Sequence, residues 1–124
     1  MPVLNFKAQF AHAVENGSKR QSIRPVRKNA INVGDKIYLY TGQRTKDCRF
    51  IGTSKCIETF SIAIKQERGK RPIVIIANST ESVEEIAQKD GFNSVEDFLA
   101  FFKNQYGNEF FGLVIRWSKI SKQK

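Results

Sequence analysis

The chain has 124 residues, enough for one domain whose hydrophobic core needs no metal ion or disulfide to hold it together. Its 21 Lys and Arg against 12 Asp and Glu give a net charge of +9, which favours polyanionic partners such as nucleic acid. Two cysteines without a Cys-x-x-Cys spacing and one histidine are too few for a structural zinc site, so we expect no metal and no cofactor.

Export and membrane insertion are also not expected. No apolar run approaches the ~20 residues that cross a bilayer, and the N-terminus lacks a basic segment followed by an apolar one. We therefore expect a soluble, cytoplasmic protein without a membrane partner, in which Cys48 and Cys56 are reduced and packed.

The first two-thirds of the chain is predicted to be rich in strands. Apolar residues recur at helical spacing only between Phe6 and Gly17, which predicts one early helix ending at a glycine. Residues 52–54 are expected to interrupt a longer strand, and the continuous apolar run 73–76 is expected to be a central strand. The predicted strands are 2–6, 21–25, 36–41, 49–51, 57–65 and 73–76.

The last third is predicted to hold two helices and a closing strand. A capping box at Ser82 and Glu85 precedes one apolar stripe, and a second helix runs from Val95 to Tyr106. The aromatic stripe of this second helix is better explained as core than as a platform for stacking bases. Strand 110–117 then closes the fold, and 119–124 is expected to be a frayed tail.

These elements predict a single α+β domain covering residues 1–124. Short turns between the strands indicate a mixed sheet that curls toward a β-barrel, with helices at its flanks.

The segment Gly17–Lys28 carries the clearest functional signal, because it holds five cations within ten positions. If Gln21–Pro25 is extended, Ser22 and Arg24 point to the same face. Lys19, in the preceding turn, can swing its ammonium toward that face. This arrangement suits an anion or a base edge. A solvated edge strand, charged to prevent edge-to-edge pairing, explains the same residues.

A polar loop follows the strand that ends at Thr41. It contains Arg44 and Lys46 beside two threonines, a composition that can bind phosphates. We expect this loop to share a cationic cleft with the Gly17–Lys28 segment.

The motif Gly-Ser-Lys-Arg-Gln-Ser-Ile-Arg at 17–24, followed by Val-Gly-Asp at 33–35, resembles the ASCH domain family. The resemblance extends over the whole chain, because Asp-Gly-Phe-Asn-Ser at 90–94, the helix after it and the closing strand also fit. Residues 39–46 are similar to a bacterial or phage branch of the family. The resemblance implies a PUA-like fold and the binding of RNA or nucleosides.

Some members of this family are amidohydrolases that act on acetylcytidine. There a lysine, a threonine and an arginine of the first motif act with a glutamate that precedes the late helix. The resemblance places Lys19 and Arg24 at the lysine and the arginine. Ser22 stands at the threonine, and Asp90 stands near the glutamate. In a hydrolase of this kind, Lys19 is the base or nucleophile, Ser22 donates to the oxyanion and Asp90 moves the proton.

A role in binding alone requires no acid–base pair. Cations then contact phosphates, while Tyr38, Tyr40 or Phe50 stacks on unpaired bases. A third alternative is a protein-interaction module of phage or host origin. The expected nucleic-acid-binding residues are Arg20, Arg27, Lys28, Tyr40, Arg44, Lys46 and Arg49.

Overall fold

The computed structural model describes residues 2–123, which form six strands and three helices. In chain order these are β1 (Val3–Phe6), α1 (Ala8–Glu15), β2 (Gln21–Pro25), β3 (Lys36–Thr41), β4 (Arg49–Lys65), β5 (Ile73–Ile76), α2 (Val83–Lys89), α3 (Val95–Tyr106) and β6 (Glu109–Trp117). The predicted α+β class is confirmed. Within this range, no helix has both the length and the apolar composition needed to span a membrane.

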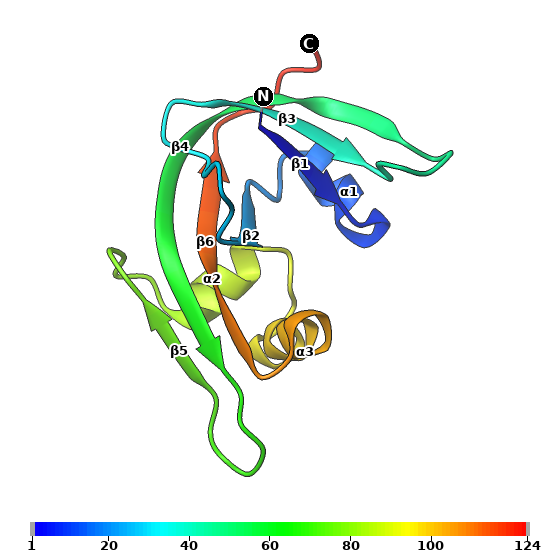
Figure 1. The fold of residues 1–124 in the computed structure, drawn as a ribbon. Helices are drawn as coiled ribbons and strands as arrows, with labels where there is room; N and C mark the ends of the chain where they lie inside the picture. The colour runs from blue at the N-terminus through cyan, green and yellow to red at the C-terminus, as the bar shows by residue number, and fades with distance from the viewer. Residues whose placement is uncertain (1, 124) are drawn as a thin grey trace.

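The six strands form one mixed sheet in the order β1-β3-β4-β6-β2, with β5 paired to β4. Only β1 and β3 pair in parallel. The long strand β4 bends through an arc that joins both halves of the sheet, and α1 and α3 lie inside this arc (Figure 1). The sheet curls as predicted but does not close into a barrel, because β1 and β2 stand at opposite ends of the strand order.

The predicted break at residues 52–54 is wrong, because β4 runs without interruption from Arg49 to Lys65. Thr53 pairs through its backbone with Ser121, and the Ser54 hydroxyl donates to the Ser118 carbonyl at 2.7 Å. A side chain at position 52 would not fit, because Ile120 lies directly over Gly52. The polar residues are therefore satisfied by the C-terminal segment rather than by solvent.

The same contacts correct the expected frayed tail at 119–124. Ser121 forms a β-bridge with Thr53, and Ile120 packs against the core. Lys122 donates to the Glu15 carboxylate at 3.1 Å. Lys124, the last residue of that predicted tail, lies outside the described residues.

Two further expectations are corrected. Strand β5 lies at an edge rather than in the centre, because its only partner among the described strands is β4. Its apolar run splits between two faces: Val74 and Ile76 pack inward, whereas Ile73 and Ile75 are exposed. Cys56 is buried, but Cys48 is exposed rather than packed.

The interior is divided into two hydrophobic clusters. One surrounds Trp117 and joins β1, β3 and α1, and the other surrounds Phe98 and joins α2, α3 and the second half of β4. Phe10 borders the first cluster, and Phe101 borders the second. The opening between the two ends of the sheet lies between these clusters.

Gly112 of β6 is required by the close approach of β2. A Cβ atom at this position would overlap the backbone carbonyl of Arg24. We predict that Gly112→Ala lowers the free energy of unfolding by at least ~1–3 kcal/mol, because the two strands must separate. Urea denaturation measures this loss.

Phe111→Ala, one position away and 65% exposed, is the control and should cost less than about 1 kcal/mol. Equal losses for the two variants would contradict the close approach of β2 and β6.

Candidate functional site

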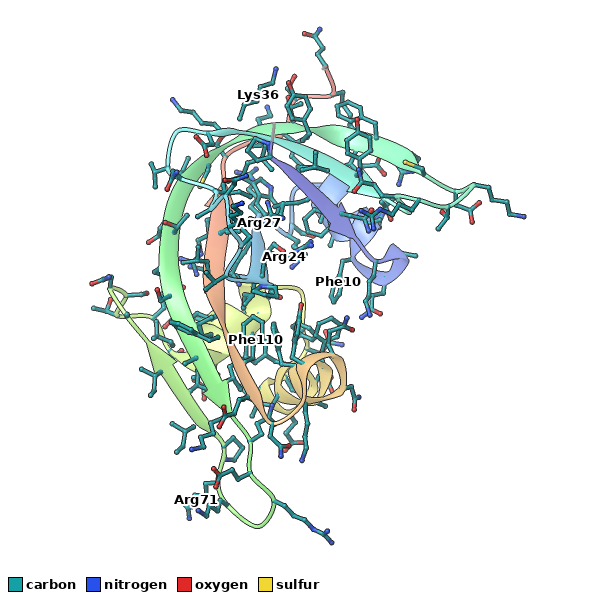
Figure 2. All side chains as sticks on the ribbon, viewed as in Figure 1. Phe10, Arg24, Arg27, Lys36, Arg71 and Phe110 are labelled. Carbon is teal, nitrogen blue, oxygen red and sulfur yellow. The ribbon has the colours of Figure 1, made fainter. Side chains whose placement is uncertain are left out.

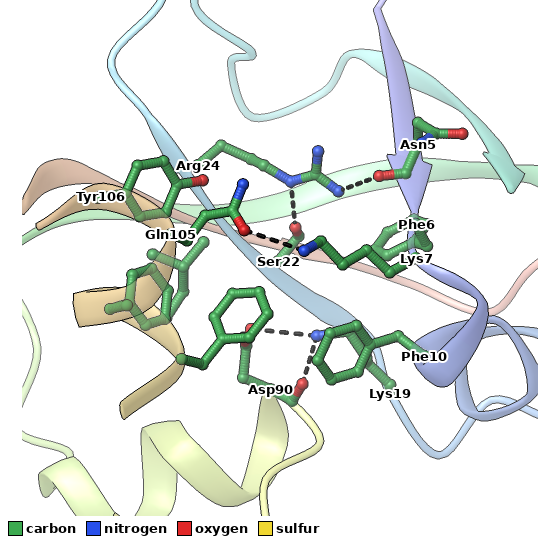
Figure 3. A pocket seen from close by; sticks show the side chains of 13 residues that line it. Asn5, Phe6, Lys7, Phe10, Lys19, Ser22, Arg24, Asp90, Gln105 and Tyr106 are labelled. Atoms are coloured by element: carbon green, nitrogen blue, oxygen red, sulfur yellow. Dashed lines mark hydrogen bonds and ion pairs between the residues drawn. The ribbon is translucent and has the colours of Figure 1, made fainter. Parts of the chain in front are cut away.

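A cavity of about 230 Å³ lies in the opening of the sheet, and we call it the Lys19 pocket. The end of β1 and Phe10 line one side, and β2 lines another (Figure 3). Helix α3 contributes a third wall through Phe101, Phe102, Gln105 and Tyr106. Figure 2 shows Phe10 and Arg24 inside the arc of the sheet, whereas Arg71 lies at the far hairpin tip.

Lys19 is the most deeply buried charged group of the pocket, with 3% of its side chain exposed. Its Nζ donates to the Asp90 carbonyl oxygen at 2.5 Å and lies 3.2 Å from Asp90 Oδ1. It also lies 5.1 Å from the centre of the Phe10 ring. Burial lowers the pKa of Lys19, and the attraction of Asp90 offsets only part of this effect.

The turn after α2 brings Asp90 to Lys19. Asp90 caps the C-terminus of α2, and Gly91 follows with φ of +99°. A Cβ atom at Gly91 would meet Phe10 at 3.4 Å and the Lys19 side chain at 3.5 Å. These are ordinary contact distances, so glycine is favoured here by the left-handed backbone of the turn rather than by lack of space.

Ser22 and Arg24 share a face of β2, as the alternation of the strand predicts. Arg24 Nε donates to Ser22 Oγ at 2.7 Å, and Nη2 donates to the Asn5 carbonyl oxygen of β1 at 2.7 Å. The guanidinium thus bridges the two ends of the open sheet. Because Ser22 Oγ accepts from Arg24, its own hydrogen is available to a ligand.

The four residues to which the resemblance assigns catalytic roles therefore line one cavity: Lys19, Ser22, Arg24 and Asp90. The aspartate is one methylene shorter than the family's glutamate, yet its carboxylate reaches the ammonium. The roles of these residues stay predictions. Among residues 2–123, no cluster of three or more His, Cys, Asp and Glu side chains could hold a metal ion.

Gln21 supports the site from outside the pocket, although nothing in the sequence pattern indicated a functional role for it. It is buried on the opposite face of β2, where Nε2 donates to Asp90 Oδ1 at 3.1 Å and to the Ile86 carbonyl at 3.0 Å. Arg116 of β6 donates to Gln21 Oε1 from two nitrogens. Because a guanidinium only donates, it fixes the orientation of the Gln21 amide and so supports Asp90.

Arg116 is in turn held by carboxylates. Glu81 and Glu58 both form ion pairs with its guanidinium. Hydrogen bonding from Arg116 lowers the pKa of Glu81 to about 2. These partners lie far apart in sequence: the paired strands β2, β4 and β6 bring Gln21, Glu58 and Arg116 together, and Glu81 comes from the segment between β5 and α2.

The aromatic stripe of α3 is divided between two roles. Phe98 and Phe102 are buried in the core, as predicted. Phe101 and Tyr106 also line the pocket, where Gln105 accepts a hydrogen bond from Lys7 at 2.9 Å. Sequence periodicity identified the buried face but could not show that its margin borders a cavity.

The expected nucleic-acid-binding residues lie outside the Lys19 pocket. Most are exposed, namely Arg20, Arg27, Lys28, Arg44, Lys46 and Arg49. Arg49 is paired with Glu15 at 2.8 Å, and Tyr40 packs edge-on against Phe50. Their role in binding stays a prediction.

The expectation of one cleft shared with the loop after Tyr40 is wrong. Part of the loop, including Gly42, Thr45 and Asp47, lines a second hollow of about 560 Å³. Residues 5–7 at the end of β1 border both hollows and separate them. Gln43 of the loop contacts this wall by donating its backbone N–H to the Asn5 side chain at 2.9 Å.

No protein-family model matches the chain, and no match was found among the curated proteins or the solved structures.

We predict that Lys19 loses its proton at lower pH than the exposed lysines, because its ammonium is buried. NMR titration of ¹³C-labelled lysine side chains measures this. Asp90→Asn should lower the Lys19 pKa further, because the variant removes the negative charge that favours the ammonium.

Glu67→Gln is the matched control, since Glu67 pairs with the exposed Lys65 and Lys70. It should leave the Lys19 titration unchanged. A Lys19 signal that titrates together with those of the exposed lysines would contradict the buried pair.

Proposed function

We propose that the Lys19 pocket binds the base of a nucleoside, either free or as an unpaired residue of RNA. The observation that carries this proposal is the convergence of an ammonium, a hydroxyl, a guanidinium and a carboxylate on one cavity bordered by aromatic rings. Proteins bind unstacked bases with such hydrogen-bonding groups and aromatic faces. The cavity is smaller than the ~300–1,000 Å³ of drug-sized sites, which suits a single base.

Two features of the sequence support the same function. The net charge of +9 favours an anionic partner such as RNA. The resemblance to the ASCH domain family rests on the residues that meet in this pocket, since Lys19, Ser22 and Arg24 come from its first motif. The convergence and the resemblance therefore rest on the same three residues, and the net charge is a separate support for an anionic ligand.

Phe10→Ala should weaken the binding of N4-acetylcytidine or cytidine, because it removes an aromatic wall of the pocket. We expect a loss of about 1–3 kcal/mol, the usual contribution of a stacked base. Isothermal titration calorimetry measures the change. Phe111→Ala, on the outside of β6, is the matched control and should bind as the wild type does. Equal weakening by both variants would contradict binding in this pocket.

We propose hydrolysis of an N-acylated cytosine as a second candidate function. The specific observation in its favour is the buried Lys19 ammonium beside Asp90, with a pKa lowered by burial. A lysine of lowered pKa holds a larger share of the neutral amine, which is the form that a general base requires. Binding alone does not require this property.

In such a reaction the oxygen of a water molecule attacks the acyl carbon and forms a C–O bond. Neutral Lys19 takes the proton released by the water, and Ser22 donates a hydrogen bond to the developing oxyanion. The Asp90 carboxylate relays this proton from Lys19 to the exocyclic nitrogen as the C–N bond breaks, which returns Lys19 to its neutral form. The products are the free amine of cytidine and the carboxylic acid.

Lys19→Ala should abolish the turnover of N4-acetylcytidine, because the base is removed. Ser22→Ala should reduce turnover by roughly 10²–10³-fold, the usual cost of one oxyanion donor. Mass spectrometry of the released cytidine measures both. Wild-type turnover should rise with pH through the lowered pKa of Lys19.

The turnover assay distinguishes hydrolysis from binding alone. Turnover that persists in Lys19→Ala would overturn the hydrolytic mechanism. Binding without turnover in the wild type would overturn hydrolysis and leave recognition as the function.

A further inference from the structure

Arg24 is half-buried and, unlike the buried Arg116, forms no ion pair among residues 2–123. Arg116 forms ion pairs with Glu81 and Glu58. Arg24 donates only to a hydroxyl and a backbone carbonyl, and lies 5.1 Å from the centre of the Phe6 ring. Among residues 2–123, no carboxylate forms an ion pair with it. Its neutral contacts orient the guanidinium without balancing its charge.

The rest of the pocket does not supply the missing negative charge. Of the lining residues, Lys7, Lys19 and Arg24 are cations, and Asp90 is the one carboxylate. Asp90 is already paired with Lys19. Burial raises the pKa of Tyr106, so its phenol stays neutral beside Arg24. The pocket therefore carries an excess of two positive charges.

Lys7 is the second cation of the pocket that forms no ion pair with a described carboxylate. Its ammonium donates to Gln105 at 2.9 Å and lies 5.3 Å from the centre of the Phe101 ring. Nη1 of Arg24 likewise donates to no group within residues 2–123. Both cations thus keep N–H groups for a ligand. An uncompensated cation in a partly desolvated site is costly, and a bound anion offsets that cost.

We propose that the pocket recognises a nucleotide, with the base inside and the phosphate between Arg24 and Lys7. This inference rests on the proposed function and specifies the ligand class of the same site. The exposure of the lining residues decides which end of the ligand enters first. Lys19 and Asp90 are buried at the floor of the pocket, whereas Lys7 and Tyr106 are exposed at its rim. Arg24 is half-buried between them, where its planar guanidinium suits the oxygens of a phosphate.

The experiment compares cytidine with cytidine 5′-monophosphate by isothermal titration calorimetry at two salt concentrations. We expect the nucleotide to bind roughly tenfold tighter or more at low salt, because charge-assisted hydrogen bonds form to its phosphate. Its advantage should shrink as salt rises. Inorganic phosphate should compete with the nucleotide more strongly than with cytidine.

The dinucleotide CpC shows whether an internal phosphodiester is accepted as well as a free monophosphate, and either result supports the phosphate site.

Lys7→Gln should reduce the ratio of the two affinities, because it removes one cation while the exposed side chain leaves the core intact. Arg71→Gln is the matched control, since Arg71 is an exposed cation at the distant hairpin tip (Figure 2). It should leave the ratio unchanged. An equal reduction in both variants would mean general attraction by the net charge and would overturn the phosphate site.

The outcomes also separate this inference from the proposed function. Equal affinities for cytidine and its monophosphate would overturn the phosphate site while leaving base recognition in place. Failure of both ligands to bind would overturn the two together.

Discussion

The contact between Lys19 and Asp90 is the interaction on which the candidate site depends. It joins the turn before β2 to the turn after α2 across 71 positions of the chain, through hydrogen bonding to a carbonyl and proximity to a carboxylate. A buried ammonium requires such partners, because an unpaired charge in this environment is strongly destabilising. Gly91 allows the approach, and Gln21 holds the carboxylate from the other face of β2. The pocket is therefore built around a charge that the fold has already compensated.

The opening of the sheet explains why the pocket lies where it does. β1 and β2 end the strand order without pairing, and the Arg24 side chain bridges them through the Asn5 carbonyl. A closed barrel would fill this gap with backbone hydrogen bonds. The open sheet leaves a polar hollow between two hydrophobic clusters, with one charge balanced at the floor and two unbalanced toward the rim. The proposed recognition of a nucleotide depends on this distribution of charge.

The sequence predicted the parts of the site that depend on local periodicity. Alternation along β2 placed Ser22 with Arg24, whereas the role of Asp90 came only from the family resemblance, which left open whether Asp90 reaches Lys19. Periodicity could not identify the Gln21–Arg116 contact, because pairing of β2 with β6 sets it across 95 positions. The sequence also misled at Gly52–Ser54, where residues expected to interrupt a strand instead make room for the C-terminal segment. Long-range packing decided both cases.

The most direct test of base recognition is the map of amide chemical-shift changes when cytidine is added to ¹⁵N-labelled protein. We expect the largest changes to cluster around the Lys19 pocket, at Ser22, Gly91 and Gln105, while Ile75 on the outer edge stays unchanged. Changes confined to the loop 42–47 would contradict base recognition in this pocket. The absence of any change at a large excess of cytidine would contradict it as well.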